Sequence, residues 1–203
     1  MNGVKPGFVL GTSEQQVQQL LVESLPTGGV FYDVGAHVGF MSLVAAQLVG
    51  ASGEVYSFEP LPENAAALRQ TIRLNRGCHW EVIESAVAAT DGHAMFAGDG
   101  ERGHIGDGGL RVRTVRLDSF AATHPPPSVV KIDVEGGELD VLRGAERLLC
   151  DHRPVVVCEL HDGLPSLTRH PVAMILRDAG YEVSWLEPIA TDTGYWTAHV
   201  VGR

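Results

Sequence analysis

One glycine-rich turn between two apolar segments constrains the fold of this chain more than any other feature. Residues 31–40 read FYDVGAHVGF, so an apolar run containing Asp33 passes into a turn with Gly35 and Gly39. A second apolar run at residues 55–58 leads to Glu59, some 20 residues beyond Gly39. Parallel α/β sheets that bind nucleotides place an acidic side chain beside a ribose in this way. The pattern therefore predicts the fold class and the kind of cofactor together.

The composition indicates one acidic domain over residues 1–203. The length of 203 residues suffices for one well-filled core, and no linker, low-complexity tract or internal repeat divides the chain. The formal net charge of −10 disfavours nucleic acid and anionic membrane surfaces as partners, because both require an excess of Lys and Arg. The three cysteines lack CxxC spacing, and no apolar stretch resembles a membrane span or signal peptide. We therefore expect a cytoplasmic protein without disulfides.

The hydrophobic periodicity alternates between helices and strands along most of the chain. Helices are predicted at residues 17–25, 40–48, 61–72, 139–149 and 171–179, the first with a capping box of Ser13 and Gln16. Strands are predicted at residues 30–34, 54–58, 80–87, 129–133, 155–160, 181–186 and 196–201. This order requires a mostly parallel sheet with helices on both faces. Seven strands with a closing hairpin fit a class I methyltransferase sheet better than a six-stranded dehydrogenase sheet.

The segment between the third and fourth strands predicts a small β-hairpin insertion. Residues 93–97 and 110–117 read as antiparallel strands after a tight turn at Asp91 and Gly92. The intervening residues 98–109 contain six glycines and His104. They predict either a solvated loop, which is favoured, or a mobile flap over a substrate.

The details of the first turn indicate which cofactor the site would take. The dinucleotide fingerprint G-x-G-x-x-G requires a glycine at the position of His37, where the backbone approaches a pyrophosphate. Its absence favours a cofactor without a pyrophosphate, such as S-adenosylmethionine (SAM). Asp33 would then lie near the ammonium and methionyl end, and Glu59 would accept hydrogen bonds from both ribose hydroxyls. The alternatives are a turn-stabilising acid for Asp33 and a helix cap for Glu59.

A second charged run, KIDVEGGE at residues 131–138, follows an apolar strand. Lys131, Asp133 and Glu135 are spaced by two, as side chains on one face of a strand are. Charges in an apolar strand are unfavourable unless they leave the sheet or pair with one another. We therefore expect Asp133 and Glu135 to emerge at the crevice. The alternative is an ion pair with Lys131 together with helix capping.

Five stretches together resemble the FkbM family of SAM-dependent methyltransferases. They are FYDVGAHVGFMSLVAA, YSFEPLPENAAALRQTIRLN, VRLDSF, VKIDVEGGELDVLRGAERLL and VVVCELH, in that family's order, and they cover most of residues 30–161. The resemblance implies a class I Rossmann-like methyltransferase fold and methyl transfer to hydroxyls of natural products, sugars or lipids. Two departures are His37, where the family usually has Asn, and Gly137, where Ala is common.

The end of the fifth strand offers a candidate base. His161 follows the buried run at residues 155–160 and would remove a proton from a substrate hydroxyl, with Glu159 on the same strand face to orient it. The alternative is a loop histidine bonded to backbone. His104 is a weaker candidate. No feature distinguishes His79, His93, His124, His152, His170 and His199.

In the methyltransferase interpretation, SAM lies across the carboxyl ends of the first, second and fourth strands. The cofactor-binding residues would be Asp33, Gly35, Ala36, His37, Gly39, Phe40, Glu59, Pro60, Ser85, Ala86 and Asp133, with Ser85 and Ala86 ending the third strand beside the adenine. The catalytic candidates for deprotonating the acceptor are, in order, Asp133, His161 and Glu135. Mg²⁺ is compatible with convergence of Asp133, Glu135 and Glu159, but an ion-pair cluster with Lys131 is favoured.

These inferences together predict an O-methyltransferase that uses SAM to modify a small hydroxylated metabolite or natural product. An N-methyltransferase for an amine or peptide shares the fold and stays open, as does a non-catalytic SAM-binding protein. A nicotinamide-dependent dehydrogenase is disfavoured, because the chain lacks the middle glycine and a Ser-Tyr-x-x-x-Lys run. The expected partner is a small-molecule acceptor, and a homodimer would follow if the last strand lay at a sheet edge and paired across it.

Overall fold

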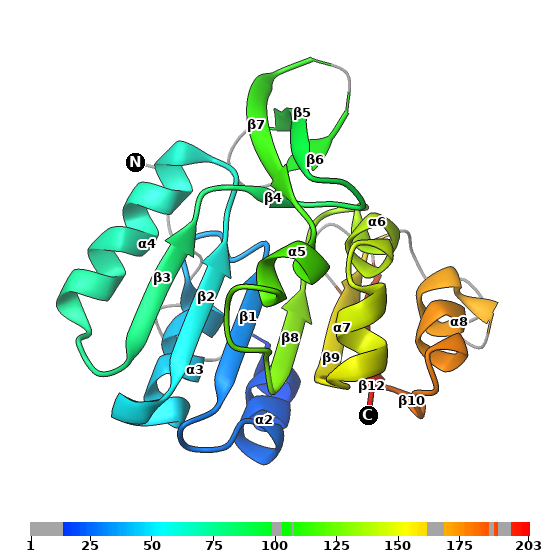
Figure 1. The fold of residues 1–203 in the computed structure, drawn as a ribbon, viewed down its shortest axis with the longest axis horizontal. Helices are drawn as coiled ribbons and strands as arrows, with labels where there is room; N and C mark the ends of the chain where they lie inside the picture. The colour runs from blue at the N-terminus through cyan, green and yellow to red at the C-terminus, as the bar shows by residue number, and fades with distance from the viewer. Residues whose placement is uncertain (1–13, 99–102, 107, 162–168, 187–188, 191–195) are drawn as a thin grey trace.

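The computed structural model describes residues 14–98, 103–106, 108–161, 169–186, 189–190 and 196–203. Its main sheet has the strand order β10-β12-β9-β8-β1-β2-β3, with β11 paired to β12 (Figure 1). The strands are β1 (Val30–Val34), β2 (Glu54–Phe58), β3 (His79–Ile83), β8 (Val129–Ile132), β9 (Val155–Leu160), β10 (Val183–Trp185), β11 (Ile189–Ala190) and β12 (Trp196–Gly202). The path from β3 to β9 is parallel, whereas β12 is antiparallel to both of its neighbours β9 and β10. The predicted mostly parallel sheet is therefore confirmed.

Helices cover both faces of the sheet, as the alternation of strands and helices predicts. One face carries α2 (Gln15–Ser24), α3 (Phe40–Val49) and α4 (Pro62–Leu74), and the short 3-10 helix η1 (Gly50–Ser52) follows α3. The other face carries α5 (Leu117–Ala121), α6 (Glu138–Arg143), α7 (Glu146–Asp151) and α8 (Pro171–Asp178). Figure 1 shows α5 and α7 in front of the sheet and α2 and α3 behind it. Alternate strand residues therefore enter two cores, with Phe31 toward α2–α4 and Tyr32 toward α5–α8.

A second, smaller sheet forms the predicted insertion. Its strands are β4 (Ala86–Val87), β5 (Gly92–Gly98), β6 (Gly103–Ile105) and β7 (Leu110–Val115), in the order β4-β7-β5-β6. β5 and β7 are antiparallel, which confirms the hairpin, and they project beyond the carboxyl ends of the main strands (Figure 1). The glycine-rich segment contains β6, which pairs with β5, so part of the predicted loop is strand.

Two predicted strand boundaries are wrong. The third strand ends at Ile83 instead of continuing through β4, because the Ser85 N–H donates to the Ile83 carbonyl in a turn that directs β4 into the second sheet. The strand predicted at residues 110–117 ends at Val115, and Leu117 begins α5 with its side chain buried in the core. The alternation of apolar residues continues through Leu117, so the hydrophobic periodicity does not show that the strand ends at Val115.

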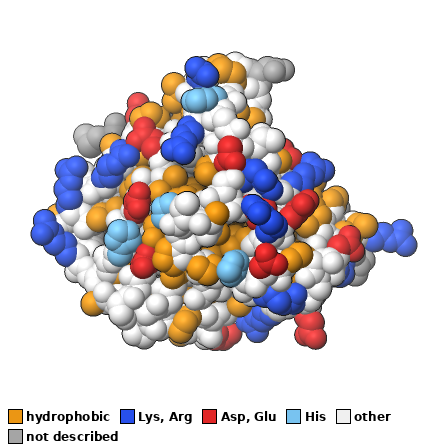
Figure 2. All heavy atoms as spheres, viewed as in Figure 1, with side chains coloured by type: hydrophobic (Ala, Val, Ile, Leu, Met, Phe, Trp, Pro, Cys, Tyr) orange, Lys and Arg blue, Asp and Glu red, His pale blue; other side chains and the backbone are white. Residues whose placement is uncertain are grey.

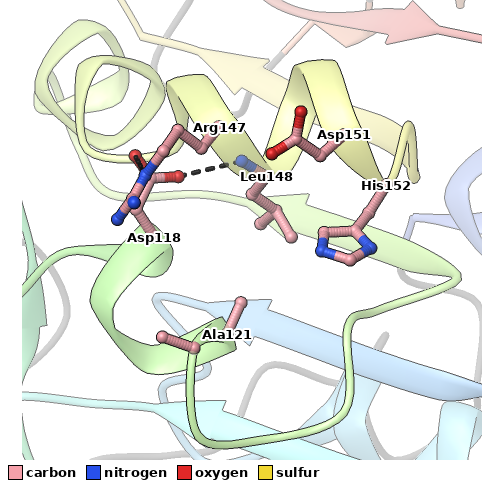
Figure 3. A pocket seen from close by; sticks show the side chains of 7 residues that line it. Asp118, Ala121, Arg147, Leu148, Asp151 and His152 are labelled. Carbon is pink, nitrogen blue, oxygen red and sulfur yellow. Dashed lines mark hydrogen bonds and ion pairs between the residues drawn. The ribbon is translucent and has the colours of Figure 1, made fainter.

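The helix predicted at residues 139–149 is two helices, because Asp118 interrupts its hydrogen-bond ladder. In a continuous helix the Leu148 N–H would donate to the Gly144 carbonyl. Instead, the Asp118 N–H donates to that carbonyl at 2.9 Å, and the Asp118 Oδ1 atom accepts from the Leu148 N–H at 2.9 Å (Figure 3). Asp118 of α5 is therefore hydrogen-bonded to the end of α6 and to α7.

The two ends of the described chain also differ from expectation. β12 lies between β9 and β10, so the premise for a homodimer, an edge position for the last strand, is wrong. At the other end α2 follows Glu14, and Ser13 of the expected capping box lies outside the described residues. In the part of the chain that the structure describes, no helix has the length and apolar character needed to cross a bilayer.

Candidate active site

Polar side chains interrupt the α2–α4 face of the sheet where the parallel strands end. On β1, β8, β9 and β12 the apolar residues of this face include Phe31, Val129, Val157 and Val201. Two positions nearer the carboxyl ends of the parallel strands lie Asp33, Lys131, Glu159 and His199. Residues two apart on a strand share a face, so all four polar residues point to the same side of the sheet. The register places Asp33 beside Lys131, and Glu159 beside His199.

Asp33, at the end of β1, is 1% exposed and only partly hydrogen-bonded. The Ser42 hydroxyl donates to its Oδ2 atom at 2.5 Å. That hydroxyl lies 2.6 Å from the Ser57 hydroxyl, which accepts from the Trp80 indole N–H at 2.8 Å. The Oδ1 atom of Asp33 is buried and has no hydrogen-bond partner among the described residues. Burial raises the pKa of Asp33, although Lys131 and Ser42 oppose this effect.

The turn after β1 fits closely against the end of β8. Gly35 has a φ of 81°, and a Cβ atom there would lie 1.8 Å from the carbonyl oxygen of Asp133, so the predicted need for glycine is confirmed. His37 has a φ of 51°, a left-handed conformation in which Asn and His are enriched, so His in place of Asn preserves the turn. A Cβ at Gly39 would lie 2.2 Å from Leu68 of α4 and 3.5 Å from Trp80 of β3, so Gly39 allows close packing at this point.

Glu59 joins the turn after β1 to the start of α4. Its Oε2 atom accepts from the His37 N–H, and its Oε1 atom accepts from the Leu61 N–H, both at 2.9 Å. The Asn64 amide donates to Oε1 at 3.4 Å. Glu59 is 5% exposed, and this burial raises its pKa to about 7 although the backbone donors lower it. The N-cap of α4 is Leu61, so the helix-cap alternative for Glu59 is wrong, although its carboxylate does accept from the Leu61 N–H.

Lys131 is the buried cation of the site. It is 4% exposed, and its Nζ atom donates to Asp133 Oδ2 at 2.8 Å and lies 3.9 Å from Glu14 Oε2. Burial would lower the pKa of Lys131, but Asp133, Glu14 and Asp33 raise it well above the ordinary value. The ion pair that the sequence offered as an alternative is thus present, and the Asp133 side chain is 24% exposed.

His161 is surrounded by four carboxylates. Its Nδ1 atom lies 2.9 Å from Glu138 Oε1, and its Nε2 atom lies 3.3 Å from Asp133, 3.7 Å from Glu135 and 3.8 Å from Glu159. Burial lowers the pKa of His161, but the hydrogen bonds to Asp133 and Glu138 raise it to about 11. The ring is therefore an imidazolium at neutral pH. Burial would raise the pKa of Asp133, but Lys131 and His161 hold it well below its usual range.

The structure brings the three catalytic candidates, Asp133, His161 and Glu135, together at the ends of β8 and β9. It differs from the sequence analysis in the residue that orients the imidazole. Glu138 contacts Nδ1 at hydrogen-bond distance, whereas Glu159 lies 3.8 Å from Nε2. In the sequence, Glu138 appears only as an acidic residue at the start of a helix, and no pattern there indicates that it contacts His161.

The remaining predicted residues surround this centre less closely. Ala36 and Ser85 are buried, and Phe40 and Pro60 are half-buried. The Glu59 N–H donates to the Ile83 carbonyl, which places the end of β3 beside Glu59. Ala86 lies in β4, one residue beyond Ser85, and His104 is exposed in β6 opposite Ala97.

The possible metal ligands Asp133, Glu135 and Glu159, which the sequence made less favoured than an ion-pair cluster, are only partly assembled. The ligand atoms of Asp133, Glu159 and His161 lie within 4.8 Å of one another, and so do those of Glu14, Glu159 and His199. Within the described residues, Glu135 belongs to neither group. Carboxylates with one imidazole are a donor set that binds divalent cations.

A pocket on the opposite face of the sheet does not have the features of a cofactor site. It is lined by Asp118, Ala121, Ala122, Arg147, Leu148, Asp151 and His152 (Figure 3). Its volume of about 150 Å³ is below the roughly 300–1,000 Å³ of ligand pockets. Asp118 is already bonded to Leu148 and Arg116. Acidic and basic side chains are interspersed on this side of the molecule (Figure 2).

Comparison with known proteins places the chain among methyltransferases. It matches the Methyltransferase FkbM domain over residues 33–183. It is similar to the hexuronic acid methyltransferase AglP of Haloferax volcanii, with 28% identity over 158 residues that cover 74% of this chain. The chain spans 64% of the length of that relative, which is less than two thirds.

Solved structures share the fold at low sequence identity. The FkbM methyltransferase of Methylobacillus flagellatus KT has a TM-score of 0.61 and 13% identity, over 97% of this chain and 60% of that one. The precorrin-6y C5,15-methyltransferase of Geobacter metallireducens GS-15 has a TM-score of 0.60 and 16% identity, over 94% and 89%. Aeropyrum pernix fibrillarin, solved with natively bound SAM, has a TM-score of 0.57 and 14% identity, over 93% and 74%.

These likenesses confirm the class I Rossmann-like methyltransferase fold that the sequence predicts. The FkbM match extends from the end of β1 to the start of β10 and includes Asp33, Glu59, Asp133 and His161. Because this match covers more than half of the chain, the protein belongs to the FkbM methyltransferase family.

Proposed function

We propose that this protein is a SAM-dependent O-methyltransferase acting on a small hydroxylated molecule. The observation that carries the proposal is the junction of Glu59, the His37 turn and Asp133 at the carboxyl ends of β2, β1 and β8. Cofactors of open α/β sheets bind at such strand ends. Membership of the FkbM family supports methyl transfer as the reaction.

The polar groups at this junction match those of SAM. Glu59 would accept hydrogen bonds from the ribose hydroxyls, and Asp33 Oδ1, which bonds to none of the described residues, would suit a cationic ammonium group. Asp33 is 1% exposed, so direct contact would require movement of the chain that covers it. The further residues that would hold the cofactor are Gly35, Ala36, His37, Gly39, Phe40, Pro60, Ser85, Ala86 and Asp133. When bound, SAM supplies an electrophilic methyl group.

The charged cluster would receive the proton of the acceptor hydroxyl. Asp133 remains ionised at neutral pH, because Lys131 and His161 lower its pKa. A carboxylate with a lowered pKa is a weak base, so positioning and exclusion of water would supply most of the acceleration. His161 is already protonated and would act by holding Asp133 in place. Glu135, 3.7 Å from His161, is the second candidate acceptor of the proton.

The acceptor class is proposed from the relative AglP, which is a hexuronic acid methyltransferase. A sugar acid offers several hydroxyls, which agrees with the expected O-methylation. Methyl transfer to an amine or peptide nitrogen would use the same fold, since acceptor choice depends on the loops around the site. The acceptor assay therefore has to include both kinds of nucleophile.

The first test is calorimetric titration of the purified chain with S-adenosylhomocysteine, with NAD as the control ligand. We expect binding of S-adenosylhomocysteine alone. Glu59→Ala should weaken this binding by about 1–3 kcal/mol, because ribose hydroxyls would lose their acceptor. Glu63→Gln, an exposed acid at the start of the same helix, is the matched control. Equal affinity of Glu59→Ala and wild type would refute the ribose assignment.

The second test is transfer of labelled methyl from SAM to a panel of uronic acids, neutral sugars and amines. Product mass and fragmentation identify the atom that receives the methyl group. A labelled hydroxyl supports the O-methyltransferase proposal. Labelling of amines alone would replace it with N-methylation, and binding of cofactor without turnover on any acceptor would indicate a non-catalytic protein.

A further inference from the structure

Two buried polar atoms beside the proposed active site have no hydrogen-bond partner. They are the Nε2 atom of His199 and the Oε2 atom of Glu14, neither of which forms a hydrogen bond with any described residue. His199 is 2% exposed. A buried polar atom that makes no hydrogen bond is unfavourable by about 1–3 kcal/mol, so such atoms are uncommon in folded proteins. The methyl-transfer mechanism uses neither residue.

Glu159 lies close to both of these atoms. Its register partner across β9 and β12 is His199, and its Oε2 atom lies 3.5 Å from His199 Nε2. The ligand atoms of Glu14, Glu159 and His199 all lie within 4.8 Å of one another. The three residues come from the start of α2 and from two adjacent strands, so the sheet holds two ligands and the helix supplies the third. Small side-chain rotations would bring all three atoms onto one ion.

The surrounding charges favour a cation at this position. Lys131 is the nearest described basic side chain to Glu14, at 3.9 Å, but its short contact of 2.8 Å is with Asp133. His161 lies 3.8 Å from the Oε1 atom of Glu159, which leaves Oε2 facing His199. Two carboxylate oxygens therefore lie near an imidazole nitrogen, and the cationic side chain that the described residues place beside them, Lys131, stays 3.9 Å from Glu14 Oε2.

We propose that Glu14, Glu159 and His199 bind one divalent transition-metal cation of the Zn²⁺ or Mn²⁺ type. One imidazole nitrogen with two carboxylate oxygens suits these ions better than Mg²⁺ or Ca²⁺, which prefer oxygen ligands alone. Water completes the coordination. The bound ion joins the start of α2 to β9 and β12, and so closes the α2 side of the crevice. The proposal goes beyond methyl transfer and holds for any acceptor.

The experiment uses the full chain after treatment with a chelator and dialysis. Zn²⁺ and Mn²⁺ are each titrated by calorimetry, and thermal unfolding is followed with and without the ion. We expect one ion per chain and a higher Tm with the ion, because a ligand that binds only the folded state stabilises it. Glu14→Gln and His199→Gln should each weaken binding by about tenfold or more and abolish the Tm shift.

Two further variants locate the ion. Glu23→Gln removes an exposed acid from the same helix and should bind the ion as wild type does. His161→Gln disrupts the neighbouring group of Asp133, Glu159 and His161 and should leave binding in place. Loss of binding in His161→Gln, with binding retained in Glu14→Gln and His199→Gln, would overturn the proposal. So would the absence of binding to the wild type at millimolar ion.

Circular dichroism checks that each variant is folded. If the His199→Gln variant, which changes a buried residue, does not fold, the ion binding of Glu14→Gln tests the proposal. A parallel titration with S-adenosylhomocysteine keeps the two proposals separate. Failure to bind that ligand while the ion still binds would count against the methyltransferase proposal alone. Failure to bind the ion while that ligand still binds would count against the metal site alone.

Discussion

At the scale of single residues, the burial of Glu59 determines its pKa. Its pKa in the folded protein is about 7, above the ordinary value of 4.5, because burial disfavours the charged form. Between pH 4.5 and about pH 7, Glu59 is therefore mostly protonated in the folded state and mostly ionised in the unfolded state. Stability of the ligand-free protein should fall as the pH rises through this window.

Affinity for S-adenosylhomocysteine should have the opposite dependence on pH. The ionised Glu59 carboxylate is the better acceptor for ribose hydroxyls, so affinity should rise from pH 6 to pH 8 with a midpoint near the pKa of about 7. Calorimetric titrations across this range measure the effect. Glu59→Gln should bind more weakly and with little pH dependence. An identical pH profile in that variant would assign the titration to another group.

Gly35 makes a separate prediction about the turn. A Cβ atom would lie 1.8 Å from the Asp133 carbonyl oxygen, and φ is 81°, so alanine would be strained in both respects. Gly35→Ala should lower the free energy of unfolding by about 3 kcal/mol or more and weaken cofactor binding. Gly77→Ala is the control, because a Cβ there meets no atom within 4 Å. Urea unfolding of both variants checks the prediction, and equal midpoints would contradict it.

At the scale of elements, Asp118 links three helices of the α5–α8 layer. It belongs to α5, donates to Gly144 at the end of α6 and accepts from Leu148 of α7. Asp118→Ala should destabilise the protein by about 2–3 kcal/mol, because a buried N–H of α7 loses its acceptor. Asp151→Ala, an exposed change in α7, should have little effect. Thermal unfolding distinguishes the variants, and a similar Tm for both would show that the backbone bonds suffice.

The same contact shows why element boundaries are less predictable than elements. Residues 139–149 have a continuous helical pattern, and the interruption comes from a residue more than 20 positions earlier in the chain. The third strand likewise ends at Ile83 because β4 pairs with β7, which follows later in the sequence. Local periodicity does not contain this information, so it located most helices and strands but not these two boundaries, and it missed the short helix α5.

At the scale of the whole molecule, Lys131 holds acidic groups from several elements together. It contacts Asp133 at the end of β8 and approaches Glu14 before α2, and it lies beside Asp33 of β1. Lys131→Met should destabilise the fold by about 3–5 kcal/mol, because the buried carboxylates lose their counterion. Arg143→Met, which removes an exposed ion pair, is the control. Urea unfolding at pH 7 measures the difference, and a wild-type midpoint for Lys131→Met would contradict the account.

The sequence alone determined the order of most strands and helices, the mostly parallel sheet, the β-insertion, the turn with Gly35 and the acid Glu59 after the second strand. These features depend on local hydrophobic periodicity and on turn-forming residues, and both can be read from residues that are close together in the sequence. It also placed Asp133, Glu135 and His161 at strand ends, and parallel strands bring such ends to one edge.

Only the tertiary structure decided which of these groups touch and which are charged. Glu138 orients His161, Asp118 joins α6 to α7, and Glu14 approaches Glu159 and His199 through contacts between residues distant in the chain. His199 had no distinguishing pattern in the sequence, because its significance depends on burial and on a register partner in β9. The pKa values of Glu59 and His161 likewise follow from burial and nearby charges, which arise only when the strands and helices pack.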